Sequence, residues 1–265
     1  ETLSVHNIDA MTNFSGFPAL TNINAVLDVD TCPSLRSFAG LEHVKQLGAL
    51  AIGLFWNALQ NPFHYDDLHS IKYNPHVRTL DSIPRFFADP QTFSSRQAGY
   101  MFRPALLSSY ALNYALGGES IFGYRLLNLT LHVGCSAIVI LLAHTLTGNQ
   151  RNGLLAGLLF LVHPTHGEPI NYISSRSDLL VSFAVLAVIA LIAIPNRFGW
   201  SRWLWYVIGL LTKSVAVVTP ALVLLFETQP ILHWKQMVRR FWGFGAITGL
   251  YLLVCETANP LLWHH

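Results

Sequence analysis

Long apolar runs without charge constrain this chain more than any other feature. Residues 46–65, 126–150 and 179–196 contain no Asp, Glu, Lys or Arg, and each approaches the roughly 20 residues that cross a bilayer core. Shorter runs of the same kind lie at 152–167, 203–212, 214–226 and 241–255. Of the 265 residues, 52% are hydrophobic and 11% are charged. The pattern predicts an all-α, polytopic integral membrane protein with about seven transmembrane helices, a multi-pass chain in contact with the lipid bilayer.

The chain divides into two parts. Residues 1–45 are rich in Asn, Thr, Ser and Asp, with short alternations such as "AVLDVD", and predict an extramembrane segment. The spacing "CPSL…SF.GLE.V..LGAL.I" within it resembles leucine-rich repeats of the receptor-L type. Residues 46–265 are the expected transmembrane domain, with a first outer loop at 60–122 and an incomplete C-terminus. In that loop, "HVRTLDSIPRFF" and "RPALLSSYALNYAL" predict helices in the membrane interface.

Basic residues in the short connections predict the orientation. If the helices alternate, three such connections fall on one side, which we take as cytoplasmic; they carry Arg151, then Arg197 and Arg202, then Lys235, Arg239 and Arg240. The opposite side then receives the other ionisable groups of interest: Asp66, Asp67, Arg103, Arg125, Lys213 and the insert 163–178. This side is the periplasm, the cell exterior or the lumen of the endoplasmic reticulum. A net charge of +2 without a run of like charge predicts no nucleic-acid partner.

Two adjacent carboxylates follow the first apolar run. Asp66 and Asp67 stand in "NPFHYDDLHS", directly after residues 46–65. One carboxylate can act as a general base, with its neighbour as a structural or metal-binding partner. Alternatively, the two residues cap the end of the first helix. The spacing alone leaves both interpretations open.

A polar insert, "HPTHGEPINYISSRSD", separates two apolar runs. His163, His166 and Glu168 can in principle bind a divalent cation, but Pro164 and Pro169 break the helix that would align them. Ionisable groups at membrane depth usually face a cavity or a partner. We expect His163 and His166 to support a site. No cofactor is assigned, and a divalent cation is the candidate that these residues suggest.

Three further ionisable residues have two interpretations each. Arg176 and Asp178 either belong to a site or pair with each other, and Asp178 is also placed to cap the following helix. Lys213 interrupts the apolar stretch 203–226, where it either meets an anionic headgroup or extends to the membrane interface. The polar residues beside Lys213 predict a break in the helix at this point.

Several segments together resemble one family. The stretches "FWNALQNPFHYDDLHSI", "FRPALLSSYALNYALGG", "FGYRLLNLTLH", "LLAGLLFLVHPTHGEPINYISSRSDLL" and "LLTKSVAVVTPALVLLFE" occur in this order over about residues 47–228. Their order and spacing resemble the membrane portion of the transmembrane and tetratricopeptide-repeat O-mannosyltransferases and their bacterial relatives. That family belongs to the C-type (GT-C) glycosyltransferase superfamily. The resemblance implies a GT-C-like helix bundle with extracytoplasmic interface helices.

The resemblance also implies a function and roles for individual residues. The expected activity is transfer of a sugar from a polyprenyl-phosphate carrier to a protein or glycan acceptor on the extracytoplasmic side. Position by position, the resemblance places Asp66 at the catalytic base, Asp67 at its neighbour and Lys213 at a Lys near the lipid phosphate. Glu168, Arg176 and Asp178 fall on the family's second outer-loop motif, and Arg103 matches an "RP" that opens an interface helix. We therefore expect Asp66, Asp67 and Glu168 to be catalytic and Lys213, Arg103 and Arg176 to bind the donor phosphate, with Asp178, His163, His166 and Arg125 in supporting roles.

One departure from the family motivates an alternative function. Relatives usually carry Glu after the Lys, where this chain has Ser214. The alternative is a non-catalytic scaffold derived from GT-C enzymes that associates with other membrane subunits, with residues 1–45 as a docking segment.

Overall fold

The structure, a computed structural model, describes residues 41–96, 101–193, 200–226 and 234–258. All secondary structure within these ranges is helical, as the sequence predicted. The predicted strands and the repeat-like stretch of residues 1–45 lie almost entirely outside the described residues. The longer helices are α2 (Leu41–Leu54), α4 (Pro104–Gly117), α5 (Ile121–Thr147), α6 (Gln150–Val162), α8 (Arg176–Ala193), α9 (Ser201–Thr212), α10 (Thr219–Phe226) and α11 (Trp234–Ala258).

Short helices connect the long ones. The first outer loop contains η6 (Trp56–Gln60), η7 (Leu68–Lys72), η8 (Pro75–Arg78), η9 (Leu80–Ser82), α3 (Ile83–Phe86) and η10 (Pro90–Phe93). The polar insert contains η11 (Pro164–His166), α7 (Gly167–Asn171) and η12 (Ile173–Ser175), and η13 (Ser214–Val218) joins α9 to α10.

The longest helices form an antiparallel pair. A turn at Gly148, in the left-handed conformation, joins α5 to α6, and the Asn149 side chain accepts a hydrogen bond from the backbone N–H of Arg151. Gly153 and Gly157 of α6 face α5, where a Cβ at Gly157 would lie 2.1 Å from Ile140 Cγ1. Small residues four apart allow helix backbones to approach this closely.

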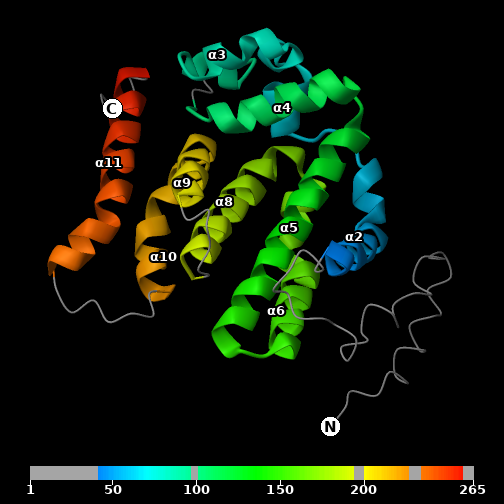
Figure 1. The fold of residues 1–265 in the computed structure, drawn as a ribbon. Coiled ribbons are helices and arrows are strands. Elements are labelled where there is room, and N and C mark those ends of the chain that lie inside the picture. The colour runs from blue at the N-terminus through cyan, green and yellow to red at the C-terminus, as the bar shows by residue number, and fades with distance from the viewer. Residues whose placement is uncertain (1–40, 97–100, 194–199, 227–233, 259–265) are drawn as a thin grey trace, which may run out of the picture.

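The second half of the bundle consists of α8 to α11, beside the α5–α6 pair (Figure 1). Helix α9 ends at Thr212, Lys213 is extended, and η13 begins at Ser214. The predicted helix break is therefore confirmed. The Tyr206 hydroxyl lies 2.6 Å from Thr248 Oγ1 and links α9 to α11.

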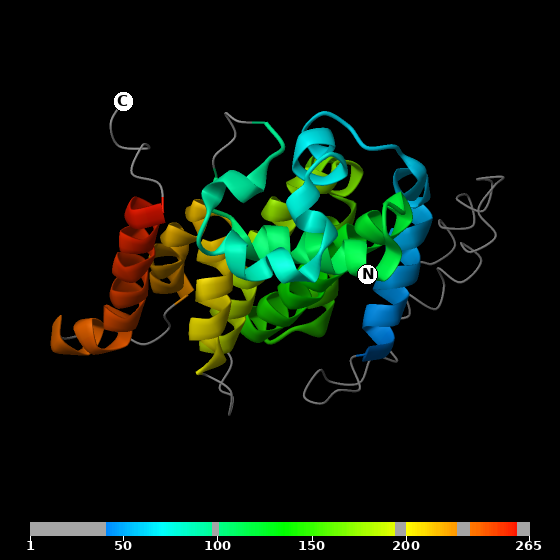
Figure 2. The ribbon, with the colours of Figure 1, turned by 90° about the horizontal axis from the view of Figure 1, so that it is seen from above.

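The first outer loop covers one end of the bundle. Figure 2, seen from above, shows α3 and α4 lying over the other helices, and α4 contacts α5, α8 and α9. The helix predicted within 103–116 is confirmed as α4. The other predicted interface helix, 76–87, is wrong as a single element, because η8 ends at Arg78, Thr79 caps η9 and α3 begins at Ile83. Buried Asn74 ties the loop together by donating to the carbonyls of Ser70, Thr92 and Phe93.

All seven apolar runs contain helix, but their lengths differ. Two helical segments of the described chain, Ile121–Thr147 and Ile173–Ala193, are long and apolar enough to cross a membrane. The first run, 46–65, does not form one helix, because α2 ends at Leu54, the short helix η6 follows, and residues 61–64 are irregular. Seven spans therefore remain a prediction. Exposed leucines on the outer faces, such as Leu155 and Leu159 of α6, suit a lipid environment.

Candidate functional site

A tight turn directs the two adjacent carboxylates in opposite directions. The Asp67 N–H donates to the His64 carbonyl at 2.8 Å, and Tyr65 between them has a φ of 41°. Tyr65 is the one residue other than glycine with positive φ in the described chain. A left-handed residue with a Cβ costs roughly 1–2 kcal/mol. The turn therefore maintains a backbone conformation that the Tyr65 side chain disfavours.

Asp67 lies inside the protein. It is fully buried, and its Oδ1 accepts a 2.7 Å hydrogen bond from the backbone N–H of Ser174 in the insert. Its Oδ2 accepts from the N–H of His64 at 3.2 Å. The carboxylate thus ties the first outer loop to the insert. The role predicted for Asp67 as a catalytic neighbour remains a prediction, but its contacts are structural.

Asp66, in contrast, faces outward. Its side chain is 63% exposed, and Oδ1 lies 3.2 Å from His69 Nε2. Its backbone N–H donates to the Tyr172 hydroxyl at 2.9 Å. Burial raises the pKa of the Tyr172 phenol, and the charge of Asp66 adds to the increase, so the phenol stays neutral. Asp66 is accessible to a substrate and fixed on one side.

Arg125 is a buried clamp between the first loop and the insert. Its Nε donates to the Asn61 carbonyl at 2.8 Å, and its Nη2 to the Pro62 carbonyl at 2.8 Å. Its Nη1 donates to the carbonyls of Ile170 and Asn171. All three nitrogen atoms have protein acceptors, so the contacts of Arg125 are structural, and its supporting role at a site remains a prediction.

Arg176 is also fully buried. Its Nε donates to Asn128 Oδ1, Nη1 to Ser109 and Nη2 to the Tyr124 carbonyl, while its guanidinium lies 4.9 Å from the Tyr110 ring centroid. The alternative that Arg176 pairs with Asp178 is wrong for this reason. Its assignment to a donor phosphate finds no support in this geometry, because every nitrogen atom already has a protein acceptor.

A second charged group lies where α4, α8 and α9 approach one another. Lys213 Nζ donates to Asp178 Oδ1 at 2.5 Å, and both side chains are partly exposed. Arg103 precedes α4, with its guanidinium 5.7 Å from the Phe93 ring centroid. Burial lowers the pKa of Arg103, and the nearby charge of Asp178 opposes that decrease. Lys213 therefore pairs with Asp178, and Arg103 lies within electrostatic range of the same carboxylate.

The histidines of the insert form a ring cluster. His166 Nδ1 lies 2.7 Å from the Phe160 carbonyl, and its ring stands 5.0 Å from that of buried His132 and 5.8 Å from that of His163. Glu168 is exposed. No group of three or more His, Cys, Asp or Glu side chains in the described part of the chain is arranged to hold a metal ion. The alternative of a site formed by His163, His166 and Glu168 therefore has no structural support.

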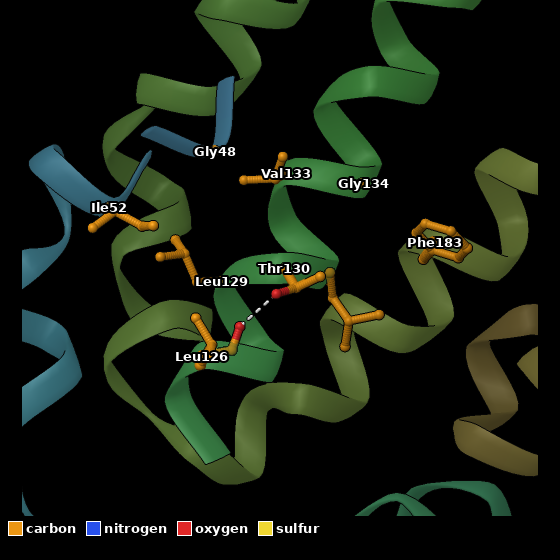
Figure 3. A pocket seen from close by; sticks show the side chains of 9 residues that line it. Gly48, Ile52, Leu126, Leu129, Thr130, Val133, Gly134 and Phe183 are labelled. Atoms are coloured by element: carbon orange, nitrogen blue, oxygen red, sulfur yellow. Dashed lines mark hydrogen bonds between the residues drawn. The ribbon is translucent and has the colours of Figure 1, made fainter. Parts of the chain in front are cut away.

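An apolar groove of about 410 Å³ lies elsewhere, against α2, α5 and α8 (Figure 3). Its lining carries no charged side chain; it comprises Gly48, Ile52, Leu126, Leu129, Thr130, Leu131, Val133, Gly134 and Phe183. It is separate from both charged groups and suits a hydrocarbon ligand or lipid better than a reacting centre.

Several contact residues were absent from the sequence-based site. His69 and Tyr172 bind Asp66, Ser94 binds His69, and Asn128 donates to carbonyls of the insert. The i, i+3 spacing of Asp66 and His69 was a detectable signal. Tyr172 and Asn128 bind residues that lie more than forty positions away in the sequence, and no local sequence pattern predicts such contacts.

Comparisons with known proteins identify relatives. The family model described as dolichyl-phosphate-mannose-protein mannosyltransferase matches residues 92–255. The protein O-mannosyl-transferase Tmtc1 of Drosophila melanogaster is 38% identical over 151 residues, which is 55% of this chain and 17% of that protein. TMTC2 of Mus musculus is 31% identical over 168 residues (60% and 20%), and TMTC3 of Homo sapiens is 27% identical over 183 (68% and 20%).

The chain thus spans about a fifth of the length of these relatives. No solved structure matches it. Asp66 and Asp67 precede the part that the family model matches, whereas Arg103, the insert and Lys213 fall within it. Because that match covers more than half of the 265 residues, the chain belongs to the dolichyl-phosphate-mannose-protein mannosyltransferase family of the GT-C superfamily.

Proposed function

We propose that the protein is a membrane glycosyltransferase that moves a mannosyl group from a polyprenyl phosphate to a hydroxyl acceptor on the extracytoplasmic side. The relatives are named protein O-mannosyl-transferases, which indicates a serine or threonine hydroxyl as the acceptor. The chain is multi-pass in this proposal, with the loop end of the bundle outside the cytoplasm.

One observation carries the proposal: an exposed carboxylate and a cationic group are linked through two adjacent residues. Asp66 reaches Ser94 through His69, and Phe93, the next residue, lies beneath the Arg103 guanidinium. Arg103 in turn feels the charge of Asp178, the partner of Lys213. The short segment 93–94 thus links Asp66 to Arg103, and this link supports a shared site for the proposed base and the proposed phosphate ligands.

The chemistry follows from this arrangement. The Asp66 carboxylate accepts the proton of the acceptor hydroxyl, whose oxygen forms a bond to the anomeric carbon of mannose. The bond from that carbon to the phosphate oxygen breaks, and the electron pair leaves with the polyprenyl phosphate. Lys213 and Arg103 stabilise the departing phosphate, because preorganised cations favour charge that develops in the transition state. Displacement at the opposite face inverts the configuration of the sugar.

The buried residues have supporting roles in this proposal. Asp67 and Arg125 hold the first loop against the insert, and Arg176 holds the insert against α4 and α5. Glu168 is exposed on the insert and is available to an acceptor.

The test uses the purified chain in nanodiscs with radiolabelled dolichyl-phosphate mannose. Transfer to serine- and threonine-containing peptides, and hydrolysis of the donor, are measured together. Asp66→Asn should lower kcat by about 10²–10⁴-fold, the usual contribution of a general base. Asp81→Asn, an exposed carboxylate on the same loop, is the matched control and should keep wild-type activity. Equal activity of Asp66→Asn and wild type would refute the proposal.

The alternative is a non-catalytic scaffold subunit, motivated by Ser214 beside Lys213. It predicts neither transfer nor donor hydrolysis, together with co-purification of other membrane subunits at a fixed ratio. Both results together would refute the enzyme proposal and support the scaffold.

A further inference from the structure

A row of hydrogen bonds lies behind the exposed carboxylate. His69 Nε2 stands 3.2 Å from Asp66 Oδ1, and His69 Nδ1 stands 3.0 Å from Ser94 Oγ. The backbone N–H of Arg96 donates to the same Ser94 oxygen at 3.0 Å. The His69 side chain is 16% exposed and Ser94 is buried, so this row is shielded from water while Asp66 is not.

The donors and acceptors fix the direction of the row. An ionised carboxylate only accepts hydrogen bonds, so the proton must lie on His69 Nε2. In the neutral ring, Nδ1 then accepts, and the Ser94 hydroxyl can donate to it because Ser94 Oγ already accepts from Arg96. A protonated ring donates from both nitrogens and keeps the same bond to Asp66. The Nε2–H bond to Asp66 is present in either state.

The imidazole is held by its backbone as well. The His69 carbonyl accepts from the N–H of Ser95 at 2.9 Å, so main chain and ring are both tied to the segment 94–95. On the other side, the backbone N–H of Asp66 is tied to Tyr172. Asp66 Oδ1 is therefore engaged by His69, and the Tyr172 phenol lies close enough to hydrogen-bond the same carboxylate.

We infer that His69 is a positioning residue for Asp66. On the basis of the proposed function, the Nε2–H bond of His69 to Oδ1 fixes the orientation in which the Asp66 carboxylate meets the acceptor hydroxyl. Ser94 sets the ring orientation, and the link from Ser94 to Phe93 beneath Arg103 couples that orientation to the cationic group. A misplacement of about 1 Å can cost on the order of 100-fold in rate.

Two matched substitutions separate positioning from simple loop support. In His69→Gln the amide nitrogen takes the place of Nε2, which keeps the donor to Asp66 and loses Ser94. In His69→Asn the amide takes the place of Nδ1, which keeps Ser94 and loses Asp66. We expect His69→Gln to keep kcat within a few-fold of wild type, and His69→Asn to lose about 10–100-fold in kcat with KM unchanged. If His69 only supported the loop through Ser94, His69→Asn would instead keep a higher kcat than His69→Gln.

A spectroscopic measurement tests the contact without activity. The protein is labelled with ¹⁵N-histidine and studied in detergent micelles, where the resonances missing from His69→Gln identify His69. Asp66→Asn should shift the His69 Nε2 resonance, and Asp81→Asn should leave it unchanged. An unshifted resonance in Asp66→Asn, or equal kcat in the Gln and Asn variants, would overturn the inference. Wild-type transfer by Asp66→Asn would instead overturn the proposed function, whatever the resonance does.

Discussion

Removal of the Asp67 carboxylate should destabilise the fold, whereas removal of the adjacent Asp66 carboxylate should not. Asp67 is fully buried, and Asp67→Ala leaves the N–H groups of Ser174 and His64 without their acceptors. Each buried donor left unsatisfied costs about 1–3 kcal/mol. Relief from burying a charge offsets part of this cost. We therefore expect a loss of about 2–4 kcal/mol.

The two carboxylates provide a matched comparison within one turn. Asp66→Ala removes a side chain that is 63% exposed and has one hydrogen bond to His69. Exposed pairs contribute about 0–1 kcal/mol. Asp67→Asn should be intermediate, because its amide oxygen can still accept from Ser174 while its NH₂ group cannot accept from His64.

Thermal unfolding in dodecyl maltoside measures the difference. The buried Cys135 thiol reacts with a maleimide dye only when the bundle opens, so labelling in a background with Cys32 and Cys255 changed to Ser reports unfolding. About 1 kcal/mol corresponds to roughly 2–4 °C in a protein of this size class. Asp67→Ala should therefore lower the apparent Tm by about 4–16 °C. An unchanged Tm for Asp67→Ala, or a larger decrease for Asp66→Ala, would refute the structural role assigned to Asp67.

Three other substitutions test separate parts of the structure. Gly157→Ala should destabilise by about 1–3 kcal/mol, because its Cβ would lie 2.1 Å from an Ile140 side-chain carbon, and the same thermal assay measures the loss. Arg125→Lys should not restore the stability lost in Arg125→Ala, since one ammonium group cannot reach carbonyls that three guanidinium nitrogens bind; limited proteolysis of the first loop would detect its release. Under the proposed function, Lys213→Met should raise the KM for the dolichyl-phosphate donor by about tenfold or more, the value of one charge-assisted hydrogen bond, and unchanged donor kinetics would remove Lys213 from the site.

Local sequence signals predicted the helices and where they break. The polar group at 212–214 lies within an apolar stretch, and the structure ends α9 there. Pro164 and Pro169 predicted an insert without a continuous helix, and the insert consists of short pieces. The first charge-free run was misleading, because the absence of charge does not specify helix length: α2 ends at Leu54, and Pro62 disfavours helix only at Asn61.

Burial of the charged residues could not be predicted in the same way. Asp66 and Asp67 are adjacent and chemically identical, but a contact 107 residues away takes one of them into the interior. Arg176 resembles a phosphate ligand in sequence, and only the folded chain shows that its nitrogens bind Asn128, Ser109 and Tyr124. Residue type and spacing specify what a side chain can bind, whereas long-range packing decides what it does bind.

The buried polar residues explain how an irregular insert is held at the end of the helix bundle. Backbone groups outside regular helices need other partners where water is scarce. Arg125 and Asn128 of α5 bind carbonyls of the insert, and Asp67 binds an N–H of the same segment. Donor side chains of α5 and the acceptor side chain of Asp67 thereby hold the insert in place. Because Tyr172 of this segment supports the Asp66 backbone, the clamp determines where the exposed carboxylate stands. Under the proposed function, substitutions in the clamp should therefore lower activity through the position of Asp66.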